Sequence, residues 1–325
     1  MAISYYEFEK PVQQAQDKLD KALAKDRQDE KHLREIQKLE TELEQARHEI
    51  YGNLTPFQRV LIARKPERPH AQDYIKALTT EFQEIHGDRG YADDKAVLCG
   101  FAQFRGVSCV VIGQCKGREV KENLKYNFGM MHPEGYRKAL RTMKLADKFG
   151  LPVLVFIDTP GAYPGVQAEE RGQFEAIARN IREMFTFTVP VLCSVIGEGA
   201  SGGAIGIGVG NVVLMLENAW YSVISPEGCA SILWRDAQFA PQAAEALKLT
   251  AQDLLELKIV EEIVPEPLGG AHYDPDTAYA NLGDAMQRQL TQLLKLSPDE
   301  LREQRFAKYR AVGEWEENLA EQTKG

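Results

Sequence analysis

One glycine-rich segment offers the residue types and spacing for chemistry. Residues 197–203 read GEGASGG and follow an apolar run that ends at Ile196. Three motifs fit these seven residues: a GxGxxG dinucleotide-binding turn, a GxSxG nucleophile elbow at Ser201, and a turn whose bare backbone N–H groups approach an oxyanion at Gly202 and Gly203. A fourth interpretation is structural, with glycines that let a helix and a strand pack closely. Each motif predicts a different enzyme, so the surrounding sequence decides among them.

The dinucleotide and hydrolase interpretations both have partners in the sequence but a poor context. Glu217 lies where a ribose-binding acid is expected, yet only about two helical turns fit between Gly203 and the next strand, too few for a full crossover helix. Asp253 and His272 follow Ser201 in serine-hydrolase order, but the histidine lies in a GGAHY segment that is typical of a surface loop. The oxyanion and structural interpretations are therefore favoured, and a serine hydrolase using Ser201 is the alternative function.

The elements that must position this segment follow from hydrophobic patterning. Strands are expected at residues 97–104, 107–114, 151–158, 189–196, 212–216, 220–224 and 259–264. Arg105 and Gly106 fit a two-residue turn, so the first two strands should be antiparallel. Three helices are expected. The first begins at Pro133 and ends before Gly150, the second runs from about residue 168 to 185, and the third follows a capping box that begins at Thr250. Helices alternating with apolar strands predict an α/β fold with a largely parallel sheet.

Both ends of the chain differ from this core in composition. Residues 1–52 are dense in charge and carry apolar residues at helical spacing, which predicts two antiparallel helices that act in assembly. These helices are expected to dock on the main body, with a long coiled coil as the weaker alternative. We expect three parts: a helical extension at 1–52, the main domain at 53–284, and a charged helical tail at 285–325.

Composition excludes several functional classes. The 325 residues carry a net charge of −9, which disfavours nucleic acids and anionic lipids as partners. No apolar stretch approaches the roughly 20 residues that span a bilayer, and the first residues lack a secretory signal, so a cytoplasmic location is expected. The five cysteines form no CxxC pair and are expected to be buried thiols, with no metal site.

Several stretches together resemble the carboxyltransferase alpha subunit of multi-subunit acetyl-CoA carboxylase, of the bacterial and plastid type. They are FIDTPGAYPG at 156–165, AEERG at 168–172, GEGASGG at 197–203 and YSVISPEGCASILWR at 221–235. Shorter matches extend the resemblance over roughly residues 5 to 295 and leave the charged tail outside it.

The resemblance implies a crotonase-like fold of repeated ββα units and a specific reaction. CO2 passes from carboxybiotin to acetyl-CoA and gives malonyl-CoA, the first committed step of fatty acid synthesis. The amides of Gly202 and Gly203 are the implied oxyanion hole for the ureido oxygen of biotin. Gly161 and Ala162, at another strand end, are candidate residues of the pocket wall, and a purely structural turn is the alternative for them.

The resemblance also implies partners. Biotin is carried on a separate biotin carboxyl carrier protein and is loaded by a biotin carboxylase that uses ATP. A beta subunit supplies the zinc ribbon, the acetyl-CoA site and a second glycine pair, so no metal is expected on this chain. An α2β2 hetero-oligomer is expected, active only with the beta subunit, in the cytoplasm or the plastid stroma.

Two further groups of residues receive structural interpretations. The basic residues Lys116, Arg118, Lys121 and Lys125 alternate with Glu119 and Glu122, which predicts a solvated helix face that pairs with itself. The 225–228 turn, Trp234 and Arg235 are expected to pack at the end of the sheet, with a role at an interface as the second interpretation.

Overall fold

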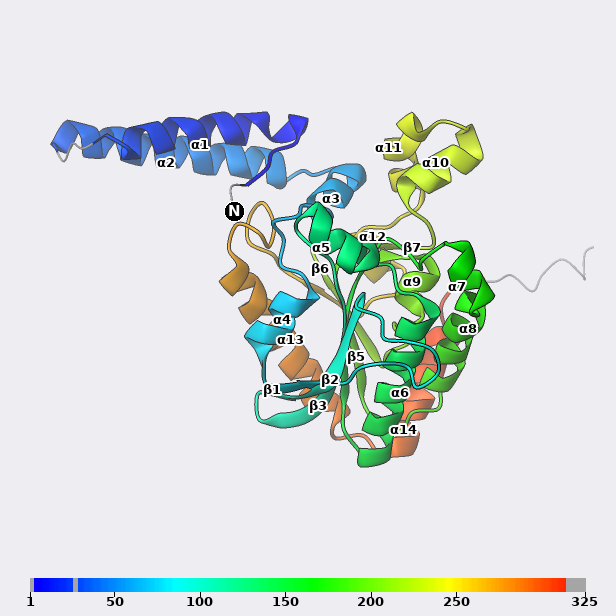
Figure 1. Ribbon diagram of the computed structural model, residues 1–325. Coiled ribbons are helices and arrows are strands. Elements are labelled where there is room, and N and C mark those ends of the chain that lie inside the picture. Colours follow the sequence, from blue (N-terminus) through cyan, green and yellow to red (C-terminus); the bar gives the residue numbers. More distant parts are fainter. Residues whose placement is uncertain (1–2, 26–28, 314–325) are drawn as a thin grey trace, which may run out of the picture.

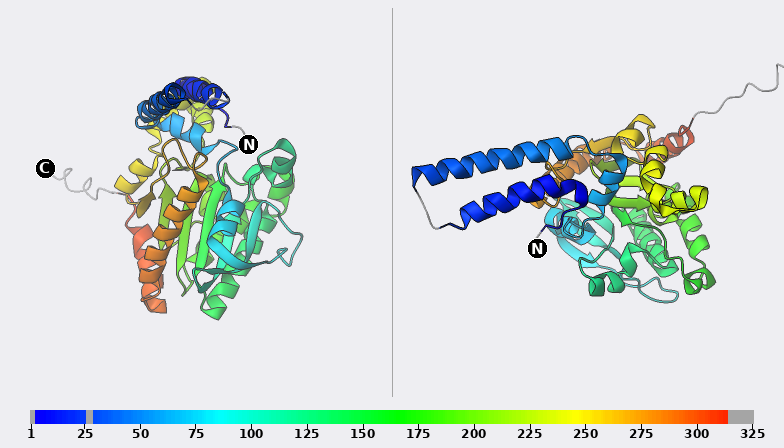
Figure 2. Two further views of the ribbon diagram at one scale, coloured as in Figure 1. Left: turned by 90° about the vertical axis from the view of Figure 1, so that its left-hand side faces the viewer. Right: turned by 90° about the horizontal axis from the view of Figure 1, so that it is seen from above.

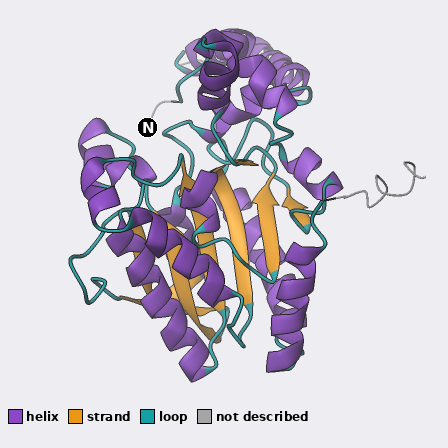
Figure 3. Ribbon diagram, turned by 90° about the vertical axis from the view of Figure 1, so that its right-hand side faces the viewer, coloured by secondary structure: helices purple, strands orange, loops and turns teal. Residues whose placement is uncertain are grey.

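A computed structural model describes residues 3–25 and 29–313 of the chain. One sheet lies at its centre, with helices on both faces (Figures 1 and 3). The eight strands are β1 (Thr79–Glu84), β2 (Val97–Phe104), β3 (Val107–Gln114), β4 (Val153–Thr159), β5 (Val191–Ala200), β6 (Val212–Leu216), β7 (Trp220–Ser222) and β8 (Glu262–Val264). Their order is β1-β2-β3-β4-β5-β6-β8, and β7 pairs with β5 outside this path. The predicted α/β class is confirmed.

Strand pairing changes from antiparallel to parallel across the sheet. β1, β2 and β3 pair antiparallel, and every pair from β3 to β8 is parallel. The predicted turn between β2 and β3 forms at Arg105 and Gly106, which have φ of +47° and +82°. Positive φ at both positions is the geometry that matches the twist of a two-residue hairpin. β1 is a strand that the sequence analysis did not predict.

Helices cover the two faces of the sheet in separate groups. α4 (Ala71–Leu78) and α13 (Pro275–Leu293) lie on one face, and α6 (Pro133–Phe149) and α8 (Gln173–Met184) lie on the other (Figure 1). The remaining helices are α1 (Lys10–Leu23), α2 (Glu30–Tyr51), α3 (Pro56–Ala63), α5 (Val120–Lys125), α7 (Val166–Glu170), α9 (Ser201–Ile205), α10 (Pro226–Trp234), α11 (Ala240–Ala246), α12 (Ala251–Glu256) and α14 (Pro298–Arg310). Every residue of β4, β5 and β6 is buried, as expected for parallel strands covered on both faces.

Several elements depart from the bounds that the sequence suggested: β7 ends at Ser222 instead of 224, β8 begins at Glu262 instead of 259, and two further differences occur at glycines. The helix expected over 168–185 is two helices, because Gly172 adopts a left-handed conformation between α7 and α8. The strand expected to end at Ile196 continues to Ala200, so β5 includes the first four residues of the glycine-rich segment. No helix in the described residues is long and apolar enough to cross a membrane.

The N-terminal helices form an antiparallel hairpin that projects from the body (Figures 1 and 2). Val12 and Leu19 of α1 and Leu43 of α2 are buried in one small apolar cluster. Only the base of the hairpin reaches the body, where Tyr51 and Ile62 complete that cluster. The hairpin is therefore docked at its base, and its outer turns extend beyond the body.

The C-terminal helices are part of the main core. The boundary expected between residues 284 and 285 falls within α13, whose Leu282, Met286 and Leu290 are buried in the main core cluster. Leu301 of α14 belongs to the same cluster. The last twelve residues of the expected tail, 314–325, lie outside the described residues.

Candidate active site

The glycine-rich segment is a strand-to-helix junction. β5 ends at Ala200 and the short helix α9 begins at Ser201, which has a φ of +56°. Gly202 and Gly203 therefore lie in the first turn of α9, where backbone N–H groups have no acceptor within the helix. Gly202 is half-buried and Gly203 is buried.

The junction lies against the second turn that the sequence analysis selected. A Cβ atom on Gly203 would lie 2.7 Å from both Ala162 N and Gly161 O, closer than real side chains approach backbone. Gly161 has a φ of +149°, a conformation that L residues rarely adopt. The two predicted pairs, Gly202–Gly203 and Gly161–Ala162, are thus neighbours in space, although about 40 residues separate them in sequence.

Close packing explains part of the glycine content. A Cβ on Gly197 would lie 2.5 Å from the Asp158 carboxylate, and one on Gly199 would lie 3.0 Å from the Tyr221 ring. Gly202 is different, because the nearest atom to its Cβ would be Ile177 Cδ1 at 3.4 Å, an ordinary contact. The structural interpretation therefore accounts for Gly197, Gly199 and Gly203, whereas nothing in the packing excludes a side chain at Gly202.

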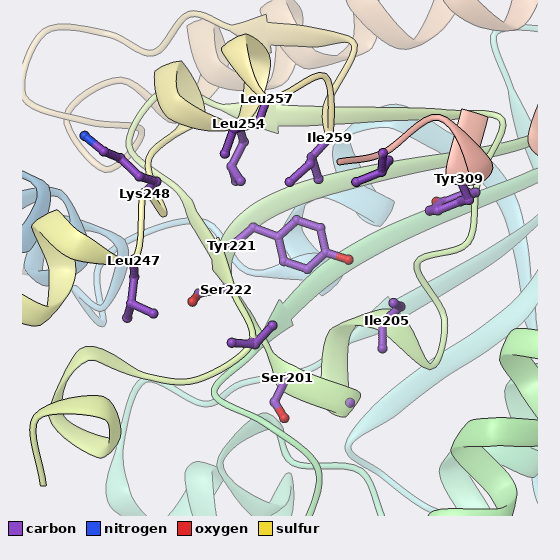
Figure 4. A pocket seen from close by; sticks show the side chains of 13 residues that line it. Ser201, Ile205, Tyr221, Ser222, Leu247, Lys248, Leu254, Leu257, Ile259 and Tyr309 are labelled. Carbon is purple, nitrogen blue, oxygen red and sulfur yellow. The ribbon is translucent and has the colours of Figure 1, made fainter. Parts of the chain in front are cut away.

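A pocket of about 700 Å³ opens beside Gly202. Figure 4 shows the Tyr221 ring between Leu254 and Ile259 on one side and Ser201 and Ile205 on the other. Its complete lining is Ser201, Gly202, Ile205, Tyr221, Ser222, Val223, Leu247, Lys248, Leu254, Leu257, Ile259, Tyr309 and Val312. An apolar pocket lined by a few polar groups is the usual form of a small-molecule site.

Lys116 is not part of a solvated helix face, which corrects the expectation for the basic cluster. Its Nζ lies 2.8 Å from Asp158 Oδ1 and 2.5 Å from Glu198 Oε2, and only 11% of the side chain is exposed. Arg118 pairs with Asp73 of α4, which is a different element. Lys121 and Lys125 lie on α5, where no side chain is buried. The prediction was wrong for Lys116 and Arg118, because both precede α5 and their acidic partners are distant in sequence.

A charged network extends from Lys116 beneath the junction. Arg64 Nε donates to Glu198 Oε1 at 2.7 Å, and its guanidinium also binds Glu227 of α10. Asp158 Oδ1 accepts the backbone N–H of Glu198 at 3.0 Å, and His70 Nδ1 lies 3.3 Å from Asp158 Oδ2. Burial alone would raise the pKa of Asp158, but attraction to Lys116 outweighs it and holds that pKa well below its usual range. The network fixes the ends of β4 and β5 relative to each other.

The serine-hydrolase alternative fails on geometry. The Asp253 carboxylate accepts hydrogen bonds from Thr250 in a capping box. His272 is buried against Tyr273, and within the described part of the chain neither of its ring nitrogens has a hydrogen-bond partner. Burial lowers the pKa of His272 to about 3. Neither residue is connected to Ser201, so there is no catalytic triad.

The dinucleotide interpretation also fails. Of the remaining structural expectations, some are confirmed and others are wrong. α9 has five residues, too few for a crossover helix, and Glu217 accepts the backbone N–H of Glu266. Cys99, Cys109, Cys115 and Cys193 are buried thiols, as expected, and Cys229 is half-buried. Trp234 and Arg235 do not pack at the end of the sheet, because they lie exposed at the end of α10. The described residues contain no cluster of three potential metal-ligating side chains.

Three side chains of the site region were not predicted from the sequence: Asp158, Glu198 and Tyr221. Asp158 and Glu198 carried a signal, since a carboxylate within an apolar strand run must find a partner when it is buried. Tyr221 is the second residue of a short strand and gave no local signal. Its place over Gly199 follows from the pairing of β7 with the last residues of β5.

Comparisons with known proteins agree on one family. A family model described as acetyl co-enzyme A carboxylase carboxyltransferase-like matches residues 5–313. The match extends beyond residue 295, which corrects the expectation that the charged tail lies outside the resemblance. A relative from Chlorobium phaeobacteroides, named acetyl-coenzyme A carboxylase carboxyl transferase subunit alpha, is 54% identical over 96% of this chain and 97% of its own length. One of the same name from Thermus thermophilus is 57% identical over 87% of this chain and 91% of its own length.

Solved structures show the same fold at low sequence identity. A transcarboxylase 12S structure aligns with a TM-score of 0.55 at 20% identity, over 69% of this chain and 42% of that chain. The beta subunit of a geranyl-CoA carboxylase from P. aeruginosa aligns with a TM-score of 0.55 at 16% identity, over 75% of this chain and 46% of that chain. This chain therefore corresponds to less than half of either of these two chains. The similarity establishes the crotonase-like fold.

Proposed function

The chain belongs to the family of acetyl-CoA carboxylase carboxyltransferase alpha subunits, and we propose that the backbone N–H groups of Gly202 and Gly203 form its oxyanion hole. The observation that supports this assignment is the bare first turn of α9 beside an apolar pocket. Donors fixed by the fold stabilise a developing negative charge without reorganising during the reaction. Each such donor contributes on the order of 3 kcal/mol of transition-state stabilisation.

The residues around this turn fit the ureido ring of biotin. The close approach of Gly203 to Gly161 and Ala162 leaves no space for a side chain on that side. Gly202 faces the pocket, where Tyr221 and Ile205 offer apolar surface for a ring system. When bound as carboxybiotin, the group supplies CO2 and an oxygen on which negative charge develops. Gly202 and Gly203 would hold that oxygen, and Gly161 and Ala162, which lie against Gly203 and do not line this pocket, would support the turn from behind.

The proposal includes the partners. Biotin would arrive on a carrier protein loaded by biotin carboxylase, and a beta subunit with a zinc ribbon would bind acetyl-CoA. The subunits would form an α2β2 assembly in the cytoplasm or plastid stroma, and the N-terminal hairpin would contribute to that assembly. In this scheme the alpha subunit supplies backbone donors and a pocket wall, and needs no side-chain base.

Mixing experiments test whether malonyl-CoA formation requires both subunits. Malonyl-CoA formation is measured with acetyl-CoA and carboxybiotin for this chain alone, for a beta subunit alone, and for the two together. We expect product only with the mixture. Equal activity of this chain alone would contradict the division between subunits.

A methyl group added at Gly202 tests the oxyanion hole. Because the Cβ of Gly202→Ala would make only an ordinary contact with Ile177, the fold should tolerate it. The methyl group would nevertheless crowd an oxygen bound at the junction, and we expect kcat to fall at least about tenfold. The control is Gly90→Ala, which adds the same group to an exposed loop. Equal kcat for the two variants would refute the proposed role of this turn.

A further inference from the structure

The side chain of Gln114 connects the two turns of the site. Gln114 is the last residue of β3 and is 0% exposed. Its Oε1 accepts the backbone N–H of Asp158 at 3.1 Å, and its Nε2 donates to Gly203 O at 2.8 Å. One amide group therefore binds the end of β4 and the first turn of α9.

Both of these backbone groups lie where regular hydrogen bonding is interrupted. α9 ends at Ile205, and Ile207 N bonds to Ala204 O, so Gly203 O has no partner in a continuing helix. The register between β4 and β5 shifts between Ile157 and Thr159, around Asp158. Buried backbone groups need partners, and here a side chain provides what the helix and the sheet do not.

The connection to Asp158 extends to the Gly161–Ala162 turn. The next residue, Thr159, accepts the N–H of Gly161 at 3.1 Å, and its hydroxyl lies 2.7 Å from both Gly161 O and Gly129 O. A shift of β4 at Asp158 would therefore move the Gly161–Ala162 turn. A shift of Gly203 would move the first turn of α9, which packs against this turn. Gln114 therefore helps to set the distance between the two turns, together with the hydrogen bond from Glu198 N to Asp158 Oδ1 and the direct contact of Gly203 with Gly161 and Ala162.

We propose that Gln114 is a positioning residue for carboxyl transfer, which sets the place of the Gly202 and Gly203 N–H groups relative to the Gly161–Ala162 turn. This inference rests on the proposed function of the glycine pair. Gln114 acts through backbone groups and does not itself touch the reacting atoms. Small errors in such an arrangement reduce the rate strongly, since a displacement of about 1 Å can cost 100-fold.

The test compares two buried amides that each donate to a carbonyl. Gln114→Glu keeps the shape and the acceptor for Asp158 N but loses the donor to Gly203 O. Asn180→Asp makes the same chemical change between α8 and α6, where Asn180 Nδ2 donates to Tyr136 O at 3.0 Å. Asn180 is also 0% exposed, so the two variants match in burial and in the loss of an amide-to-carbonyl bond; Gln114 Nε2 in addition lies 3.4 Å from Met131 Sδ. Gln114→Met is uncharged and of similar length. It takes the place of Gln114→Glu if the new carboxylate of that variant prevents folding.

Thermal midpoint, kcat and KM are measured for each variant in the complete alpha–beta complex. We expect Gln114→Glu and Gln114→Met to lower kcat by about 10- to 100-fold with KM changed less than about threefold, because the defect lies in the transition state. Asn180→Asp should lower the thermal midpoint but leave kcat within about twofold. Equal changes in kcat at both positions, or unchanged kcat in a folded Gln114 variant, would overturn the proposal.

The outcomes separate this inference from the proposed function. If the wild-type complex forms no malonyl-CoA, or Gly202→Ala is fully active, the proposed function fails whatever the Gln114 variants do. If Gly202→Ala is impaired while the Gln114 variants behave like Asn180→Asp, only the positioning role fails.

Discussion

Lys116 and Arg305 are both largely buried cations, but the protein surrounds them differently. Lys116, beneath the glycine junction, lies between the carboxylates of Asp158 and Glu198. Arg305 of α14 has no acidic partner among the described residues. Its guanidinium donates to the carbonyls of Met184, Phe187 and Val189 and to the side-chain oxygen of Asn211. One cation is held by opposite charge, and the other by neutral acceptors.

The pKa values of the two groups move in opposite directions. Burial alone would lower the pKa of Lys116, but attraction to Asp158 and Glu198 outweighs it and raises that pKa. Burial lowers the pKa of Arg305 to about 10, since neutral acceptors do not offset the loss of water. The site region therefore depends on charge balance, whereas Arg305 is held in place by hydrogen bonds to neutral groups.

The largest effect is expected from Lys116→Met. Removing one partner of a buried ion pair leaves the other charge uncompensated and costs about 3–5 kcal/mol, so the free energy of unfolding at pH 7 should fall by that amount. The matched control is Lys121→Met on α5, where no side chain is buried. Urea unfolding measures the stability of both variants. Equal losses of stability would show that Lys116 does not neutralise a buried carboxylate.

The pH dependence of Lys116→Met sharpens this prediction. In the wild type the pKa of Asp158 is lower in the folded than in the unfolded chain, so this group stabilises at neutral pH and the contribution is lost in acid. Without Lys116 the pKa of the buried carboxyl should lie above its unfolded value. The stability difference between variant and wild type should therefore narrow from pH 7 to pH 5. A constant difference would contradict electrostatic pairing.

Arg305→Met should have a smaller effect without this pH dependence. The variant leaves neutral acceptors unsatisfied but no buried charge, and we expect a loss of roughly 2–4 kcal/mol that is constant between pH 5 and pH 8. Arg302→Met, on the same helix but half-exposed in its pair with Asp299, should change stability by less than about 0.5 kcal/mol. A loss for Arg305→Met that changes with pH over this range would break the distinction between the two cations.

The smallest effect on function is expected at the base of the N-terminal hairpin. Glu9 and Lys65 form an ion pair at 2.8 Å with both side chains fully buried, and Glu9 also accepts from Tyr51 Oη. Because Glu9→Gln leaves the buried Lys65 ammonium without its carboxylate, stability should fall by about 3–5 kcal/mol, whereas kcat of the alpha–beta complex should stay within about twofold. Glu7→Gln is the exposed control. A large loss of kcat for Glu9→Gln but not for Glu7→Gln would show that the buried Glu9–Lys65 pair affects activity although it lies outside the glycine junction.

Local patterns in the sequence were sufficient for the main elements. The apolar runs identified the central strands, and Arg105–Gly106 identified the β2–β3 turn, because these features depend on neighbouring residues. Boundaries were less accurate where a glycine interrupts or extends an element, as at Gly172 and at the end of β5. Matching stretches also identified the family, since each motif keeps its residues together in sequence.

Local patterns were enough to place Gly202 and Gly203 between a buried strand and a short helix. The contact of Gly203 with the Gly161–Ala162 turn, and the pairing of Lys116 with Glu198, 82 residues away, arise only in the folded chain. The physical reason is that hydrophobic period and turn chemistry act over a few residues. Contacts between strand ends arise only when the sheet brings separate parts of the chain together, so their partners leave no local trace.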